Sequence, residues 1–88
     1  FGNYSRYIDQ DIHEDTVFIK HSGYGEMALL FALVHPEKKI IAHEEDYEKN
    51  ELAKYAAQDL VNNILFLSGC EYMIDGTEKM LVYDWSTL

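Results

Sequence analysis

The sequence has 88 residues, 48% of them hydrophobic, and a net charge of −9. This length suits one small domain, and the acidic balance excludes a nucleic-acid-binding surface, which would be basic. No apolar run reaches the roughly 18 residues that a membrane span needs, so we expect no membrane insertion. Cys70 is alone and cannot form an internal disulfide, which favours a cytoplasmic location. Because the first residue is Phe1, we expect residues 1–88 to be one domain of a longer protein.

An amphipathic helix is predicted at the start of the chain, over Phe1–Asp11. Aromatic and branched apolar residues recur there at helical spacing, with polar residues between them. They are Tyr4, Tyr7, Ile8 and Ile12. We expect this helix to lie on a sheet.

The next stretch predicts a strand, a glycine turn, a helix and a second strand. Thr16–Ile19 is rich in β-branched residues and leads into His21–Gly25, after which Glu26–His35 is helical and Pro36 ends the helix. Lys39–Ala42 is again a strand. Such a crossover is right-handed, so the two strands should pair in parallel.

The turn contains glycines at a spacing with a physical meaning. Gly23 and Gly25, followed by Ala28, match the form G-x-G-x-x-G/A, and Glu44 lies about 20 residues further on. Gly23 allows a sharp turn with positive φ, Gly25 leaves the backbone open to a ligand, and Ala28 permits close packing of helix and strand. Glu44 is placed to accept hydrogen bonds from a ribose. The alternative is that the glycines only form a tight turn.

The helix over Glu26–His35 is apolar on every side, because Met27 to Val34 are hydrophobic without a break. A helix of this kind needs cover on more than its sheet-facing side. We therefore expect either a homodimer or packing against the rest of a longer chain.

The following helix is predicted over Tyr47–Leu60, with a narrow apolar stripe made by Leu52, Ala56 and Leu60 and flanked by Ala53 and Ala57. Asp46 suits the N-cap position, and an acid in the first turn suits the positive end of the helix dipole. Asp46 and Glu48 are thus assigned to the start of the helix, and only Glu44 to a ligand.

Two further strands are predicted, over Asn63–Ser68 and Lys79–Tyr83. Between them, Asp75-Gly76 permits a hairpin in which Tyr72–Ile74 pairs antiparallel with Met80–Val82. Because the first of these runs is so short, we favour an irregular crossover.

Taken together, these segments resemble the first half of a class I S-adenosylmethionine-dependent methyltransferase domain. SGYGEMALLFAL is similar to its first motif, IIAHEEDYEKNELAK to its second strand and the acid that holds the ribose, and NNILFLSGCEYMIDGTEKMLVYD to its third and fourth strands. The resemblance implies a three-layer Rossmann-like α/β fold, with a mainly parallel four-stranded sheet in the order 3-2-1-4 and helices on both faces. The methyl donor would lie across the carboxyl ends of the strands.

The resemblance also implies a set of residues that would hold S-adenosylmethionine. They are Ser22, Gly23, Tyr24, Gly25 and Glu44, with Cys70 and Glu71 in the loop over the adenine. It assigns no metal and no catalytic residue, because the family's catalytic elements mostly come later in the chain.

Two positions depart from the family pattern. Ile19 stands where the family has an acid, and His21 stands where it has a glycine. We therefore favour a degenerate, non-catalytic methyltransferase-like appendage of a larger bacterial protein, such as a glycerol-phosphate acyltransferase-like enzyme. The alternatives are a genuine donor-binding half of a methyltransferase and a nicotinamide-nucleotide-binding fragment.

A zinc site and a cysteine nucleophile are less favoured alternatives. His21, His43, Glu44 and Cys70 have zinc-binding side chains, but their spacing matches no compact metal motif. Cys70 could act as a nucleophile only with a histidine beside it, and nothing in the sequence marks such a pair.

Overall fold

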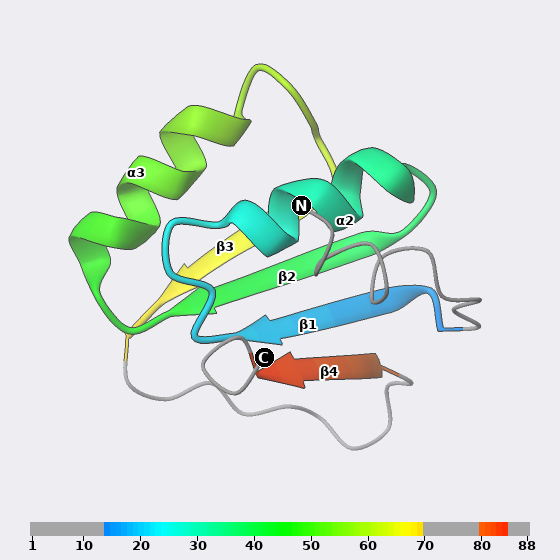
Figure 1. The fold of residues 1–88 in the computed structure, drawn as a ribbon, viewed down its shortest axis with the longest axis horizontal. Helices are drawn as coiled ribbons and strands as arrows, with labels where there is room; N and C mark the ends of the chain where they lie inside the picture. The colour runs from blue at the N-terminus through cyan, green and yellow to red at the C-terminus, as the bar shows by residue number, and fades with distance from the viewer. Residues whose placement is uncertain (1–13, 70–79, 85–88) are drawn as a thin grey trace.

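The computed structural model describes residues 14–69 and 80–84, which form a four-stranded sheet and two helices (Figure 1). The elements in chain order are β1 (Thr16–Lys20), α2 (Glu26–Val34), β2 (Lys39–Glu44), α3 (Tyr47–Ala57), β3 (Ile64–Ser68) and β4 (Met80–Asp84). The helix predicted over Phe1–Asp11 lies outside the described residues.

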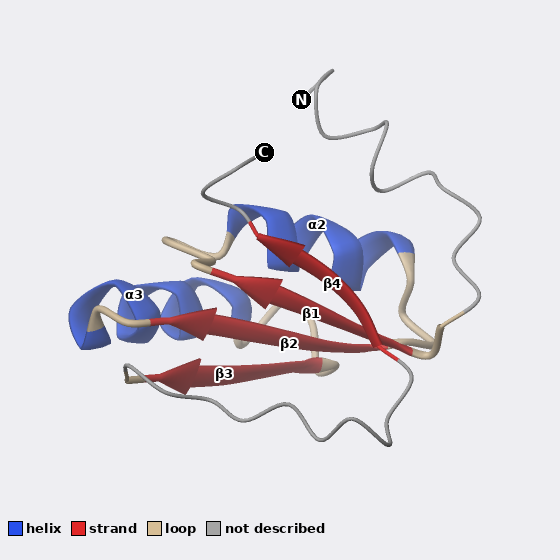
Figure 2. Ribbon diagram, turned by 90° about the horizontal axis from the view of Figure 1, so that it is seen from below, coloured by secondary structure: helices blue, strands red, loops and turns tan. Residues whose placement is uncertain are grey.

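The strands pair in parallel in the order β3-β2-β1-β4, which confirms the predicted topology. The crossovers through α2 and α3 advance in the same direction across the sheet. Right-handed connections therefore place both helices on one face, as Figure 2 shows. The link from β3 to β4, with the choice between hairpin and crossover, lies outside the described residues, and helix cover of the second face stays a prediction.

The core lies between the sheet and α2. In the parallel register Val17 is opposite Ile40 and Ile19 is opposite Ala42. These side chains pack with α2 residues into one buried cluster, completed by Met27, Ala28, Phe31 and Ala32. Strand β2 is buried without interruption from Ile40 to His43, as expected for a central strand of a parallel sheet.

Helix α2 ends one residue before the predicted boundary. The His35 N–H donates to the Phe31 carbonyl at 2.8 Å, and Pro36 disfavours helical backbone in the residue before it. On the outer side, Leu33 is 50% and Val34 47% exposed. The apolar character of this helix therefore exceeds what the sheet covers.

Helix α3 begins as predicted. Asp46 is its N-cap, and the Asp46 carboxylate accepts the backbone N–H of Glu48 at 2.9 Å and that of Lys49 at 3.3 Å. The helix ends at Ala57, three residues before the predicted boundary at Leu60.

The predicted apolar stripe of α3 is wrong at its centre, whereas the alanines predicted to flank it are buried. Leu52 and Leu60 are 59% and 60% exposed, whereas the buried positions of the helix are Asn50, Ala53 and Ala57. The reason is steric, because α3 packs so closely on the glycine turn that only small side chains fit there. Closeness of approach, more than hydrophobicity, selects the buried face.

The sheet face opposite the helices is also apolar. Phe18 and Ile41 are buried near its middle, while Leu65 on β3 and Val82 on β4 are 43% and 44% exposed.

Neither α2 nor α3, the helices of the described residues, has the length and apolar content that a membrane crossing requires.

Candidate functional site

The turn that joins β1 to α2, residues 21–25, is called the glycine turn below. It follows the carboxyl end of β1 and is tied to the end of β2 by a hydrogen bond from the Ser22 N–H to the His43 carbonyl at 2.9 Å. Positive φ values occur at His21 (53°), Gly23 (60°) and Gly25 (82°). The predicted sharp bend at Gly23 is therefore confirmed, and the bend uses three left-handed residues rather than one.

Glu44 lies directly beside this turn. Its Oε1 accepts the backbone N–H of Gly23 at 2.8 Å, and its Oε2 accepts the backbone N–H of Asp46, also at 2.8 Å. One carboxylate thus joins the glycine turn to the start of α3. The sequence placed Glu44 opposite the bend, but it did not predict that both carboxylate oxygens would hold backbone amides.

Gly25 has a structural role that the sequence did not reveal. A Cβ at this position would lie 2.9 Å from the Ala53 Cβ and 3.6 Å from the Phe66 ring, so the missing side chain leaves room for α3. Gly25 is also the N-cap residue of α2, which has no side-chain cap. The space at Gly25 therefore serves helix packing, where the sequence suggested access for a ligand.

The exposed side of the turn makes two looser contacts with the segment that follows β2. His21 Nδ1 lies 3.9 Å from Glu45 Oε1, and both side chains are about half exposed. The Lys49 amine lies 5.7 Å from the centre of the Tyr24 ring, in a cation–π arrangement. Exposed contacts of these kinds contribute little to stability, about 0–1 kcal/mol each.

Two buried polar atoms near α2 and α3 remain without a hydrogen-bond partner in the described part of the chain. Ser22 is 2% exposed and its Oγ is one of them, and Asn50, 3% exposed, contributes its Oδ1. Ser22 was among the predicted ligand-binding residues, whereas Asn50 was not. The only sequence signal for Asn50 is that it lies three and seven residues before Ala53 and Ala57, on the small-residue face of α3.

The predicted site residues are thus only partly brought together. Ser22, Gly23, Tyr24 and Gly25 share one turn, and Glu44 is hydrogen-bonded to it. Cys70 and Glu71 lie outside the described residues, so their assignment to an adenine loop stays a prediction. Ile19, where the sequence resemblance led us to expect an acid, is fully buried in the core.

The other parts of the described chain contain few features of a binding site. Among the described residues, no group of three His, Cys, Asp or Glu side chains could hold a metal ion. A shallow hollow of about 370 Å³ lies at the other edge of the sheet, lined by residues 36–39 and 62–65. It includes none of the predicted site residues.

The charge around the glycine turn is negative. Acidic residues at the ends of β2 and the starts of α2 and α3 outnumber the basic residues Lys20, His21 and Lys49; they are Glu26, Glu44, Glu45, Asp46 and Glu48. Anions normally bind favourably at a helix N-terminus, but the N-terminus of α2 is surrounded by acidic side chains. The electrostatics therefore disfavour a phosphate group here.

Searches for related proteins found no matching family model and no matching curated protein. Solved structures with a similar fold include the YcgJ protein from Bacillus subtilis, which is 22% identical with a TM-score of 0.72 over 92% of this chain. Another is a protein-L-isoaspartate O-methyltransferase, 19% identical with a TM-score of 0.65 over 91% of this chain. This chain spans 37% of the first and 27% of the second. At these identities the likeness establishes a shared α/β fold.

Proposed function

We propose that this chain is a methyltransferase-like domain that has lost donor binding and serves as a non-catalytic appendage of a larger bacterial protein. The proposal rests mainly on Glu44, because each of its two carboxylate oxygens already accepts a backbone N–H of the chain. In the resembled family an acid at this position holds the ribose. Here the carboxylate fastens two turns of the chain to each other.

The other positions of the motif support the same proposal. Ile19 is a core residue where an acid would contact the donor, and His21 carries a side chain where a glycine would leave the backbone open. The space beside Gly25 is filled by Ala53. These three positions thus either contact another part of the fold or depart from the family pattern.

The charge of the site bears on which ligand could still bind. S-adenosylmethionine carries a sulfonium and an ammonium, whereas a nicotinamide dinucleotide carries a pyrophosphate. A site flanked by Glu26, Glu44 and Glu45 repels the second more than the first. The electrostatics therefore favour the methyl donor over a nicotinamide nucleotide among the alternatives.

The test is a titration of the isotope-labelled chain with S-adenosylhomocysteine, followed by NMR. We expect no saturable shifts at the backbone amides of Gly23, Gly25 and Glu44 at about 1 mM ligand, the upper end of common substrate affinities. Saturable shifts confined to these amides would overturn the proposal. NADH at the same concentration is the matched control for binding of any adenosine.

A genuine donor-binding half of a methyltransferase is the second candidate. It is favoured by Ser22, whose Oγ is buried beside the turn without a partner among the described residues, because buried polar groups are normally satisfied. On this alternative the same titration saturates, and Ser22→Ala weakens it by roughly tenfold, the loss of one hydrogen bond.

The identity of the larger protein is a separate part of the proposal. A glycerol-phosphate acyltransferase-like enzyme is supported by the sequence resemblance alone. Deleting this domain from such an enzyme should leave acyl transfer intact and alter the assembly or abundance of the enzyme. Loss of acyl transfer with the fold preserved would contradict the appendage role.

A further inference from the structure

The outer face of α3 carries two large apolar side chains among acids. At about 100° per residue, Leu52 and Tyr55 lie on the side opposite the buried face, and they are 59% and 75% exposed. That buried face is made by Asn50, Ala53 and Ala57. Two exposed acids, Glu48 and Glu51, share that side of the helix, and the exposed Asp59 follows in the turn after its end. The acidic–apolar face is defined here as Glu48, Glu51, Leu52, Tyr55 and Asp59.

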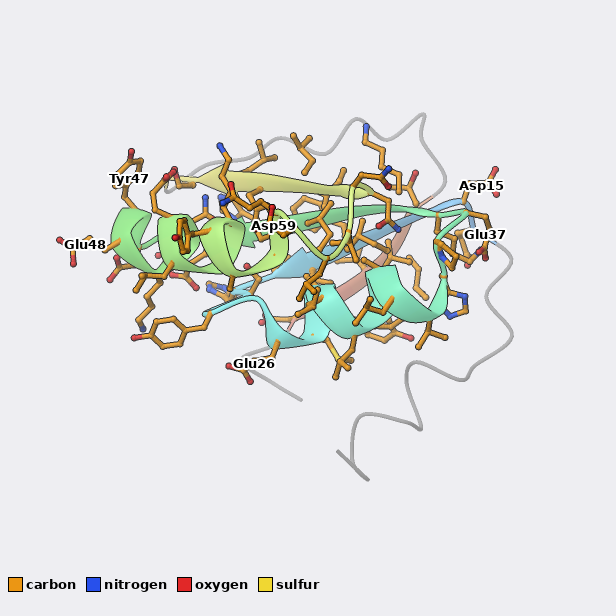
Figure 3. All side chains as sticks on the ribbon, turned by 90° about the horizontal axis from the view of Figure 1, so that it is seen from above. Asp15, Glu26, Glu37, Tyr47, Glu48 and Asp59 are labelled. Carbon is orange, nitrogen blue, oxygen red and sulfur yellow. The ribbon has the colours of Figure 1, made fainter. Side chains whose placement is uncertain are left out.

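This arrangement differs from an ordinary solvated helix. Single exposed apolar residues need no explanation, but Leu52 and Tyr55 are one turn apart and form a neighbouring pair. An exposed tyrosine beside an aliphatic side chain, rimmed by charges, is typical of the centre of a protein–protein contact. Figure 3 shows Glu48 projecting away from the ribbon at one end of the helix.

The sign of the charge selects the partner. Nucleic acid and anionic membranes would be repelled by the three acids. A second copy in a two-fold dimer would set the same acids against each other, on chains that each carry a net charge of −9. A partner segment with apolar residues flanked by lysine or arginine satisfies both the apolar pair and the acids.

We infer that the acidic–apolar face of α3 docks a basic amphipathic segment of another protein. The segment lays its apolar side on Leu52 and Tyr55 and its cations beside Glu48, Glu51 and Asp59. This surface is separate from the glycine turn, so the inference stands whether or not the turn binds a methyl donor.

The probe is a designed helical peptide of leucine and lysine, labelled for fluorescence anisotropy and titrated with the 88-residue chain. We expect saturable binding at low salt that weakens as salt is raised. The same peptide with glutamate in place of lysine should not bind. Equal binding of both peptides, no binding of the lysine peptide, or concentration-dependent self-association of the chain would each overturn the inference.

Matched variants locate the contact. The double variant L52Q/Y55Q should weaken peptide binding at least tenfold, while Leu33→Gln, at a similarly exposed leucine of α2, should change it less than twofold. Glu48→Lys should weaken binding more than Glu37→Lys, since Figure 3 places Glu37 and Glu48 at opposite ends of the structure. Circular dichroism checks that each variant is folded. Equal effects of the paired variants would contradict the proposed site.

Discussion

Glu44 Oε1 accepts the backbone N–H of Gly23 across a sequence separation of 21 residues, at 2.8 Å. This bond joins the first turn of the fold to the second, and the other oxygen of the same carboxylate extends the link to Asp46. The contact gives the carboxylate at this position a structural role that requires no ligand. It also yields the first prediction.

Replacing Glu44 should test this structural role directly. Glu44→Ala removes both acceptors and should lower the free energy of unfolding by about 2–3 kcal/mol, because charge-assisted hydrogen bonds to backbone amides are lost. Glu44→Gln keeps one acceptor oxygen and should cost about half as much. Urea unfolding followed by circular dichroism measures both. Glu45→Gln, at the exposed neighbour, is the control and should change stability by less than about 0.5 kcal/mol. A stable Glu44→Ala variant would show that the carboxylate is free for another task.

Gly25 should resist substitution for a reason of packing. Gly25→Ala places a Cβ 2.9 Å from that of Ala53 at a φ of 82°. We expect a loss of at least about 2 kcal/mol, of which roughly 1 kcal/mol is backbone strain.

The variant Gly69→Ala separates the effect of backbone strain from that of the steric clash. Gly69 has a φ of 108°, but no atom of the described residues beyond its chain neighbours lies within 4 Å of its Cβ position, so the variant should show backbone strain alone. In a double-mutant cycle, Ala53→Gly should partly rescue Gly25→Ala, with a coupling of about 0.5 kcal/mol or more. Equal losses at Gly25 and Gly69, with no coupling to Ala53, would remove the steric explanation.

His21 tests whether the left-handed position would prefer glycine. Its φ is 53°, a region that costs a residue with a Cβ about 1 kcal/mol, although His tolerates it better than most. The comparison of His21→Gly with His21→Ala isolates the Cβ, because both variants lose the imidazole contact with Glu45. We expect thermal unfolding to show that His21→Gly is more stable than His21→Ala by about 1 kcal/mol. The reverse order would mean that the backbone relaxes out of this conformation in solution.

Asn63 should be more important than its neighbour Asn62. The Asn63 Nδ2 lies within hydrogen-bonding distance of three carbonyls at the end of α2 and the start of β2, those of Lys38 (2.9 Å), His35 (3.2 Å) and Ala32 (3.4 Å). Asn63→Asp replaces this donor with an anion facing carbonyl oxygens and should cost about 2–3 kcal/mol. Asn62→Asp adds the same charge at an exposed site and should cost less than about 0.5 kcal/mol. Equal urea midpoints for the two variants would refute the assignment.

Much of this fold could be predicted because the signals were local. The β-branched run before the glycine turn, the uninterrupted apolar run of β2 and the Asp46 cap each follow from a short stretch of sequence. The crossover rule predicted the parallel pairing of β1 with β2, whereas the order of the four strands was predicted from the resemblance to the methyltransferase family. The proximity of Glu44 to Gly23 followed, because the carboxyl ends of neighbouring parallel strands share one edge of the sheet.

What could not be predicted depended on distances between elements. Nothing in the sequence around Leu52 shows that α3 approaches Gly25 too closely for a leucine, so hydrophobicity pointed to the wrong face. The buried Asn50 gave no signal either, since a polar residue in a helix is normally assigned to the solvated side.

The last prediction compares Leu52 and Ala53, neighbouring residues of α3. The alanine is buried and the leucine is exposed, the reverse of what their hydrophobicity suggests. Ala53 is 3% exposed and in contact with the glycine turn, so Ala53→Leu should overpack the interface and cost about 2–3 kcal/mol. Leu52→Ala removes a larger apolar side chain but from a position that is 59% exposed, and it should cost less than about 0.5 kcal/mol. Both are read from urea unfolding curves with unchanged slopes. A costly Leu52→Ala beside a tolerated Ala53→Leu would restore the stripe of Leu52, Ala56 and Leu60 and would rotate α3 away from the position described.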